Sequence, residues 1–396
     1  MNHRLPNQPV GAPAYDSPTS PVSNPIPPIS PELQLLLACA STGPDIAVAS
    51  QKLDWERFFN LAKGHGLLPL AYVALNRNQG NQSAPDHEIK RLRNAFYLNS
   101  ARVLAGREQL SQLLKALHAA GVGAVPLKGI DLAMKLYGDE NLRAVGDIDI
   151  LIPHAMRERA SAALAELDYR PLAIPTAQAR ITQSYSHHDV FVGDRGRAVV
   201  ELHWSFAPSN LAVDPDMETI WGRTQPEHFD GAVCQRLDKM DLAFFLCVHG
   251  SKHHWRRLAW LADLLRLPGQ SALEWPDAWH DCQARGYGRM MRLQLWLLHL
   301  LFDAPLPASV LERIGNDRRC VALARYVVKT LDDEIFDPNQ NSLQIIAFDA
   351  AVRDRLSESL RVAGGSLVAA TRVYGALMLS PRRGSNAAAD PTQKAG

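Results

Sequence analysis

Two aspartates separated by one isoleucine lie in an apolar segment, residues 145–152, with the sequence VGDIDILI. If this segment is a β-strand, side chains two positions apart share a face, so Asp147 and Asp149 lie side by side with Cα atoms about 6.6 Å apart. Carboxylate oxygens at this spacing can bind a divalent cation, and such carboxylates are costly to bury without one. The segment therefore predicts a metal site.

A third carboxylate, Glu201, lies in another apolar segment, which we expect to be the second strand of a hairpin. Residues 188–192 and 197–204 would pair across the turn 193–196, which is rich in residues that tolerate positive φ. Glu201 and His203 would share one face of the second strand. Glu201 would then complete a three-carboxylate metal site on the same mixed sheet. His203 would be either an acid–base group or a histidine bonded within the sheet.

A glycine turn precedes these carboxylates in the chain. Residues 122–127 are apolar, as in a buried strand, and Lys128 and Gly129 then open a helix expected over residues 130–137. Glycine lets the backbone approach an anion, the first N–H groups of the helix point at it, and Lys128 adds a positive charge. The segment predicts a phosphate-binding corner, and the alternative is a simple tight turn with an exposed lysine.

Basic and histidine side chains elsewhere could also contact a phosphate. Arg143 would pair with a phosphate or with one of the aspartates, or would be an exposed loop residue. Lys252 and His253 belong to a later helical segment in which His249 and His253 are four residues apart and share one face. These residues would line a ligand cleft or lie between packed helices. A hydrolase metal site of His249, His253 and Asp263 is a third hypothesis, although no H-E-x-x-H motif completes it.

The elements that must position these residues follow from hydrophobic periodicity. Helical spacing dominates before and after the segment that carries the carboxylates, and strand-like runs occur within it. We therefore expect an α+β protein, with a small mixed sheet and its helices flanked by N-terminal helices and a C-terminal helical domain. The expected divisions are a disordered proline-rich arm, a helical region, the core, a helical domain and a disordered tail, over residues 1–30, 31–120, 121–236, 237–380 and 381–396.

Two of the expected helices are long. One covers residues 88–120 and another covers residues 349–377. The first would present one apolar inner face, made of Leu92, Phe96, Leu104, Leu110, Leu113, Leu114 and Leu117.

Length, charge and cysteine content narrow the classes of protein. Of the 396 residues, 46% are hydrophobic, enough for a sizeable core, and the 42 basic and 41 acidic residues nearly cancel. This balance makes long nucleic acid and anionic membranes unlikely partners. The five cysteines are scattered without a C-x-x-C pair, so we expect reduced thiols and a cytoplasmic protein. The most apolar segments, residues 242–248 and 293–302, are too short to span a bilayer.

The order of these motifs resembles a known signature. A glycine turn at Lys128–Gly129, an Asp-x-Asp strand and a later strand with one acidic residue, Val200-Glu201-Leu202, are similar to the nucleotidyltransferase (polymerase beta-like) superfamily. The segments LKGIDLAMKLYGDENLRAVGDIDILI, VVELHW and HGSKHHWRRLAWLADL more closely resemble the uncharacterised bacterial nucleotidyltransferase family NTP_transf_5. The resemblance covers roughly residues 55–302.

This resemblance implies a Mg²⁺-dependent or Mn²⁺-dependent enzyme that transfers a nucleoside monophosphate from an NTP to an unknown acceptor and releases pyrophosphate. Asp147 and Asp149 would be metal ligands, and Glu201 would bind the catalytic metal or act as general base. Gly129 and the N–H groups after it would hold the β- and γ-phosphates. The superfamily usually has Gly-Ser or Gly-Gly at this turn, whereas this chain has Gly129-Ile130, so Lys128 would have to replace the hydroxyl.

A second function of a different class fits the same residues. A fold does not guarantee its reaction, and the atypical turn and the large helical flanks are also compatible with a non-catalytic nucleotide sensor or a partner-binding protein. Both hypotheses assign nucleotide contacts to the same side chains, Lys128, Arg143, His203, Lys252 and His253. They differ in whether pyrophosphate is released.

Overall fold

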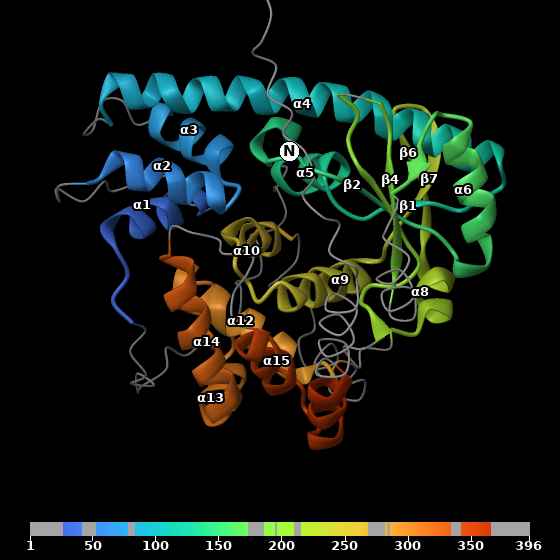
Figure 1. Cartoon of the computed structure of the whole chain (residues 1–396). Coiled ribbons are helices and arrows are strands. Elements are labelled where there is room, and N and C mark those ends of the chain that lie inside the picture. The colour runs from blue at the N-terminus through green and yellow to red at the C-terminus, as the bar shows by residue number, and fades with distance from the viewer. Residues whose placement is uncertain are drawn as a thin grey trace, which may run out of the picture.

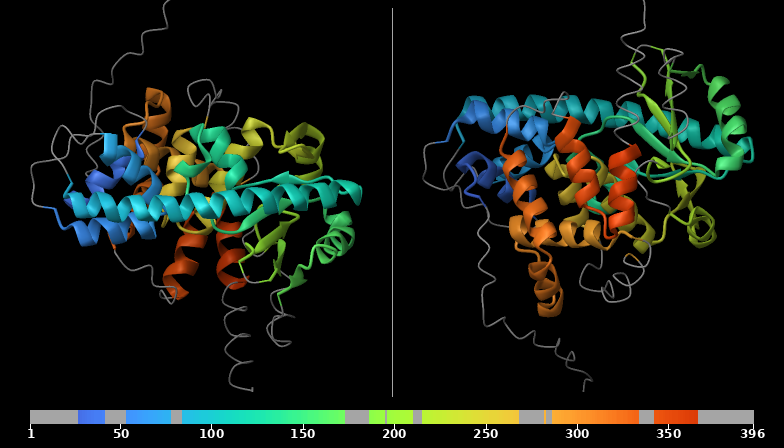
Figure 2. Two further views of the ribbon diagram at one scale, coloured as in Figure 1. Left: turned by 90° about the horizontal axis from the view of Figure 1, so that it is seen from above. Right: turned by 60° about the horizontal axis from the view of Figure 1, so that its bottom comes forward.

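The structure is a computed structural model, drawn in Figures 1 and 2. It describes residues 27–41, 53–77, 84–172, 186–194, 196–209, 215–267, 282, 286–333 and 342–365. The predicted disordered arm and tail lie outside these residues, except for residues 27–30 of the arm. None of the described helices is long and apolar enough to cross a membrane.

The centre of the molecule's β-structure is a five-stranded sheet with the order β1-β2-β5-β4-β3. Strands β2 and β5 are parallel, and the other neighbours in the sheet are antiparallel. The strands are β1 (Val125–Pro126), β2 (Ile148–Leu151), β3 (Arg170–Pro171), β4 (His188–Val192) and β5 (Val200–His203). The prediction of an α+β protein with a small mixed sheet is confirmed, and β4 and β5 form the expected hairpin.

Four helices and a second hairpin complete the region around this sheet (Figure 1). The helices are α4 (Asp86–Ala119), α5 (Ile130–Tyr137), α6 (Arg157–Ala165) and α8 (Met217–Arg223), with short 3₁₀ turns η1 (Glu140–Leu142) and η2 (His154–Met156). The hairpin consists of β6 (Gln225–Phe229) and β7 (Ala232–Arg236). It joins the chain beside β1, where the N–H of Gln235 donates to the carbonyl of Ala124 at 2.8 Å.

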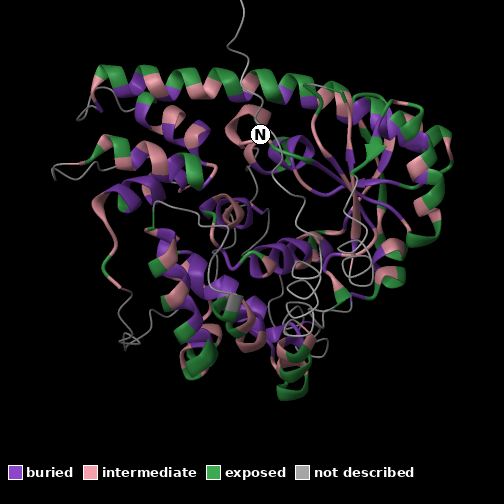
Figure 3. Cartoon of the chain, viewed as in Figure 1, coloured by how far each residue is buried: buried purple, intermediate pink, exposed green. Residues whose placement is uncertain are grey.

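Of the remaining helices, α9 runs beneath the sheet and most of the others lie farther from α6 (Figure 1). These remaining helices are α1 (Pro31–Ala40), α2 (Trp55–Gly64), α3 (Leu68–Arg77), α9 (Lys239–Lys252), α10 (Leu258–Leu265), α12 (Gly288–Phe302), α13 (Ala308–Asn316), α14 (Arg318–Leu331) and α15 (Ser342–Ala351). N-terminal and C-terminal helices contribute to one apolar core, and Figure 3 shows their buried faces turned toward one another. Burial of these faces is the main force that holds the two sets of helices together.

Alternation along the strands gives the sheet two different faces. Ile148, Ile150 and Leu202 are buried in a core that the sheet forms with the C-terminal part of α4 and with α6. Asp149 and Leu151 point to the opposite face. Leu151 belongs to the core shared with α9, so the face that carries Asp149 is directed toward the helical part of the molecule.

Helix α4 crosses the molecule, with the N-terminal helices at one end and the sheet at the other (Figure 2). Its Leu92 packs in the helical core, whereas Leu110 and Leu117 pack beneath the sheet. The prediction of one continuous apolar face is wrong at Leu104, which is 71% exposed. The buried stripe of the middle of α4 runs through Val103 and Gly106 instead, so Leu104 points away from it.

The predicted helix over residues 349–377 is wrong at its start. Helix α15 ends at Ala351, a turn follows over residues 352–355, and residues 356–365 are helical again. The turn brings the chain back so that Val352 packs in the helical core with Phe348. Residues beyond 365 lie outside the described part of the chain.

The loop that leads into β2 is held by side chains from distant helices. Asn99 of α4 donates to the carbonyls of Asn141 and Arg143, both at 3.1 Å, and accepts from the N–H of Val145 at 3.2 Å. The guanidinium of Arg143 donates two hydrogen bonds from Nε and one from Nη2 to the carboxylate of Asp263 on α10, at 3.0 to 3.1 Å. Asp263 is fully buried. These contacts fix the entry of the chain into β2.

We expect Asp263→Asn to destabilise the fold by about 3–5 kcal/mol, because it leaves the buried guanidinium of Arg143 without its counter-charge. Urea unfolding at neutral pH measures the loss. The matched control is Glu56→Gln, which removes one charge of the exposed pair with Arg91 and should change stability little. Equal effects of the two substitutions would contradict the assignment.

Candidate functional site

Four predicted site residues meet on the polar face of the sheet. Asp149 on β2 and Glu201 on β5 are register partners in the parallel pair. The Nζ of Lys128 lies 2.8 Å from Oδ1 of Asp149, and the Nε2 of His203 lies 3.0 Å from the same oxygen. His203 Nε2 also lies 3.2 Å from Oε2 of Glu201. The atoms of Asp149, Glu201 and His203 that could bind a metal all lie within 4.8 Å of one another.

Asp149 is a buried carboxylate that stays ionised because of its neighbours. Burial alone would raise its pKa, but the positive charge of Lys128 and the hydrogen bond from His203 outweigh burial and hold the pKa well below its usual value. The hydrogen bond from His203 is also the main cause that lowers the pKa of Glu201. Both carboxylates are therefore anionic at neutral pH.

Asp147 lies apart from this group. The predicted strand segment began at Val145, whereas β2 begins at Ile148, and Asp147 is exposed in the segment before it. Loss of hydration raises the pKa of Asp147, and the negative charges of Glu201 and Asp149 raise it further. The charges of both carboxylates therefore act on Asp147. Among the described residues, however, it is not part of the group formed by Asp149, Glu201 and His203.

Gly129 forms the predicted turn between β1 and α5. Its φ of 75° and ψ of −132° are open to glycine and strained for other residues, and it occupies the N-cap position of α5. No side chain caps the helix there, so the first N–H groups of α5 lack the usual side-chain acceptor. Lys128 points inward to Asp149, which contradicts the alternative of an exposed lysine.

The C-terminal end of α9 brings Lys252 to the same face. Its Nζ lies 3.2 Å from Nε2 of His187, and burial, followed by the charge of Lys128, lowers the pKa of Lys252 to about 8. The turn after α9 is tight: a Cβ on Gly250 would lie 2.3 Å from the ring of Trp255, which is fully buried. His253 is exposed at this end and lies beside the ring of Trp260.

Two other predicted residues lie elsewhere. Arg143 is buried against Asp263 and so contacts neither a carboxylate of the site nor the solvent-facing edge. Asp263 is consequently not available as a third ligand for His249 and His253, whose rings pack against each other and against Trp260. The hypothesis of a hydrolase metal site on these three residues is wrong for this reason.

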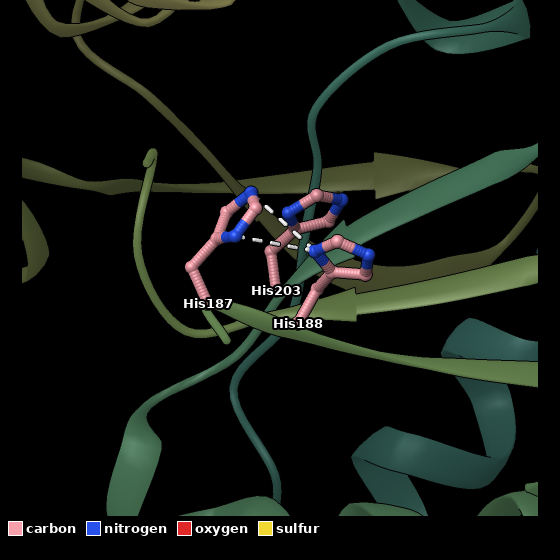
Figure 4. A group of neighbouring side chains, drawn as sticks. All are labelled: His187, His188 and His203. Atoms are coloured by element: carbon pink, nitrogen blue, oxygen red, sulfur yellow. Dashed lines mark hydrogen bonds between the residues drawn. The ribbon is translucent and has the colours of Figure 1, made fainter. Parts of the chain in front are cut away.

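Sequence reasoning missed the histidines at the start of β4. His188 is the register partner of His203, and the buried His187 precedes it. The side chains of all three converge on one point (Figure 4). The signal was the pair of adjacent histidines at the beginning of a predicted strand, opposite a strand that itself carries a histidine. Asn99, which clamps the loop before β2, had no comparable local signal.

A mixed sheet with carboxylates on one face, beside an uncapped glycine turn, has the layout of a nucleotidyltransferase core. Residues 51–303 match a family described as uncharacterised nucleotidyltransferase, and the chain belongs to that family. The predicted family is thereby confirmed. No curated protein matches the chain.

Replacement of Lys128 tests the electrostatics of Asp149. We expect Lys128→Met to lower the free energy of unfolding by about 1–3 kcal/mol at neutral pH, since a buried carboxylate loses a charged partner. Because the folded-state pKa of Asp149 is lowered, its contribution is present above the unfolded pKa of about 4 and is lost on acidification. Urea unfolding should therefore show the difference from wild type shrinking below about pH 4. Lys63→Met, at an exposed lysine of α2, is the control.

Proposed function

We propose that this protein is a Mg²⁺-dependent nucleotidyltransferase that moves a nucleoside monophosphate from an NTP to an acceptor and releases pyrophosphate. The observation that carries the proposal is that Asp149, Glu201 and Lys128 meet on one face of the sheet, next to the turn at Gly129. Family membership supports the reaction class. The acceptor is not identified by any of these residues.

The donor set fits a hard divalent cation. Asp147, Asp149 and Glu201 supply carboxylate oxygens, which Mg²⁺ and Mn²⁺ prefer. Loss of hydration, followed by the negative charges of Glu201 and Asp149, raises the pKa of Asp147, and a bound cation would favour its ionised form. When bound, Mg²⁺ would neutralise phosphate charge and lower the pKa of an attacking hydroxyl. These three residues would hold it.

The chain's own residues would orient the triphosphate. The uncapped N–H groups of α5 offer donors to an anion, and Gly129 allows the backbone to approach closely. Lys252 adds a cationic group from the helical side. Glu201 is better suited to be a ligand than a general base, because a carboxylate with a lowered pKa accepts a proton weakly.

One observation favours the alternative of a non-catalytic nucleotide sensor. Oδ1 of Asp149 is already bound by Lys128 and His203, so a metal at that oxygen would have to displace one of them. A protein that binds Mg·NTP but releases no pyrophosphate with any acceptor would fit the sensor. Pyrophosphate release is therefore the measurement that separates the two functions.

Asp147→Asn should abolish or strongly weaken Mg²⁺-dependent NTP binding and leave the fold intact, because the exposed side chain has no structural partner among the described residues. Thermal unfolding with each Mg·NTP measures binding, since a ligand of the folded state raises the apparent stability. Asp194→Asn, at an exposed turn of the hairpin, is the matched control. If the Asp147 variant is stabilised by Mg·NTP as strongly as wild type, the metal assignment is wrong.

Titration of Lys252 gives a second test. Its pKa of about 8 means that it is cationic below that pH and neutral above it. We expect affinity for Mg·NTP to fall between about pH 7 and pH 9, because Lys252 loses its positive charge over this range. The triphosphate is already ionised there, so its own titration does not mask the effect. Calorimetric titration of wild type and Lys252→Arg checks this, as the arginine stays charged throughout. Parallel pH profiles for the two proteins would remove Lys252 from the nucleotide contacts.

A further inference from the structure

Three histidine side chains converge beside the carboxylates. His187 and His203 are buried and His188 is partly buried, and each offers a ring nitrogen within 4.8 Å of those of the other two. Figure 4 shows the three rings facing one another from the start of β4 and the end of β5. The ring centroids of His187 and His188 are 4.4 Å apart, and those of His188 and His203 are 4.9 Å apart.

His203 has the bonding pattern of an oriented metal ligand. Its Nε2 lies between Asp149 and Glu201, and ionised carboxylates only accept hydrogen bonds, so Nε2 carries the hydrogen. In the neutral ring, Nδ1 is then left with its lone pair. This atom is buried and has no hydrogen-bond partner among the described residues. A carboxylate that fixes one ring nitrogen while the other faces a metal is the usual arrangement around metal-bound histidines.

The spacing of the other two rings also suits a metal. Nδ1 of His188 lies 3.3 Å from Nδ1 and 3.4 Å from Nε2 of His187. Both distances are long for a hydrogen bond. Two nitrogens that each lie about 2.0–2.1 Å from a tetrahedral Zn²⁺ are about 3.3–3.4 Å apart. The pair is therefore close to the separation that a shared metal would impose.

We propose that His187, His188 and His203 bind one divalent transition ion of the Zn²⁺ or Co²⁺ type, at a site distinct from the carboxylate site for Mg²⁺. Imidazole nitrogens select such borderline ions, whereas Mg²⁺ prefers oxygen. Three histidines leave a fourth position open, as in catalytic zinc sites. The nearby charges of Asp149 and Glu201 favour a cation on the far side of His203.

The protonation state of His187 and His188 is compatible with metal binding. Burial lowers the pKa of His188 to about 4 and that of His187 below its ordinary value, so both are neutral, the form that binds metals, at physiological pH. Lys252 donates to Nε2 of His187. This ammonium would have to withdraw if Nε2 binds an ion, and its charge opposes the ion in any case.

Titration of the metal-depleted full-length chain with Co²⁺ alone tests the site. We expect one Co²⁺ per chain, with the visible absorption bands of a tetrahedral nitrogen-ligated ion. His187→Gln and His188→Gln should each weaken binding by about 10-fold or more. His228→Gln, at an exposed histidine of β6, should bind as wild type does. Wild-type affinity in both site variants, or no visible bands in the unaltered protein at saturating Co²⁺, would overturn the proposal.

A second variant separates loss of a ligand from loss of the fold. Lys252→Met removes the opposing charge, so Co²⁺ should bind about 5-fold more tightly or better, a gain that misfolding does not produce. Weaker binding would overturn the site.

Asp147→Asn separates this site from the proposed Mg·NTP site, because Asp147 contacts none of the three histidines among the described residues. The variant should keep the Co²⁺ spectrum even if it loses Mg·NTP binding. Loss of the spectrum in this variant would count against two distinct sites.

Discussion

A single buried negative charge organises the centre of this molecule. The carboxylate of Asp149 is 4% exposed, and removing an ion from water costs several kcal/mol unless partners replace the lost hydration. The partners are Lys128, from the turn after β1, and His203, from the end of β5. Charge neutralisation at Asp149 therefore holds together three chain segments that meet only when β1, β2 and β5 are adjacent.

The same constraint makes the two aspartates of the motif unequal. Asp149 is buried and has a lowered pKa, whereas Asp147 precedes the strand, is exposed and has a raised pKa. Lys128 and His203 hold the pKa of Asp149 low, whereas loss of hydration and the charges of Glu201 and Asp149 raise the pKa of Asp147. Two like residues of one motif thus lie in different environments, because the strand begins between them.

Local patterns were sufficient for most of the elements but not for the contacts between them. Alternation marked β2 and β5, and the glycine turn before α5 followed from residue types alone. The pairing of Arg143 with Asp263 joins residues 120 positions apart, and no local pattern distinguishes that arginine from an exposed one. Leu104 was assigned to an inner face because it is apolar, whereas the buried stripe of α4 passes through its neighbour Val103.

His203 links the two proposed metal sites. Its Nε2 hydrogen is bonded to Asp149 and Glu201, and its Nδ1 faces the other two histidines. A cation bound by both carboxylates would compete for the oxygens that orient this ring, while an ion on Nδ1 would strengthen the Nε2 hydrogen bonds by making that hydrogen more acidic. The register that pairs His188 with His203 and Asp149 with Glu201 therefore does more than build a sheet. It places carboxylate oxygens on one side of the His203 imidazole and two further imidazoles on the other, so the charge on one side affects the other.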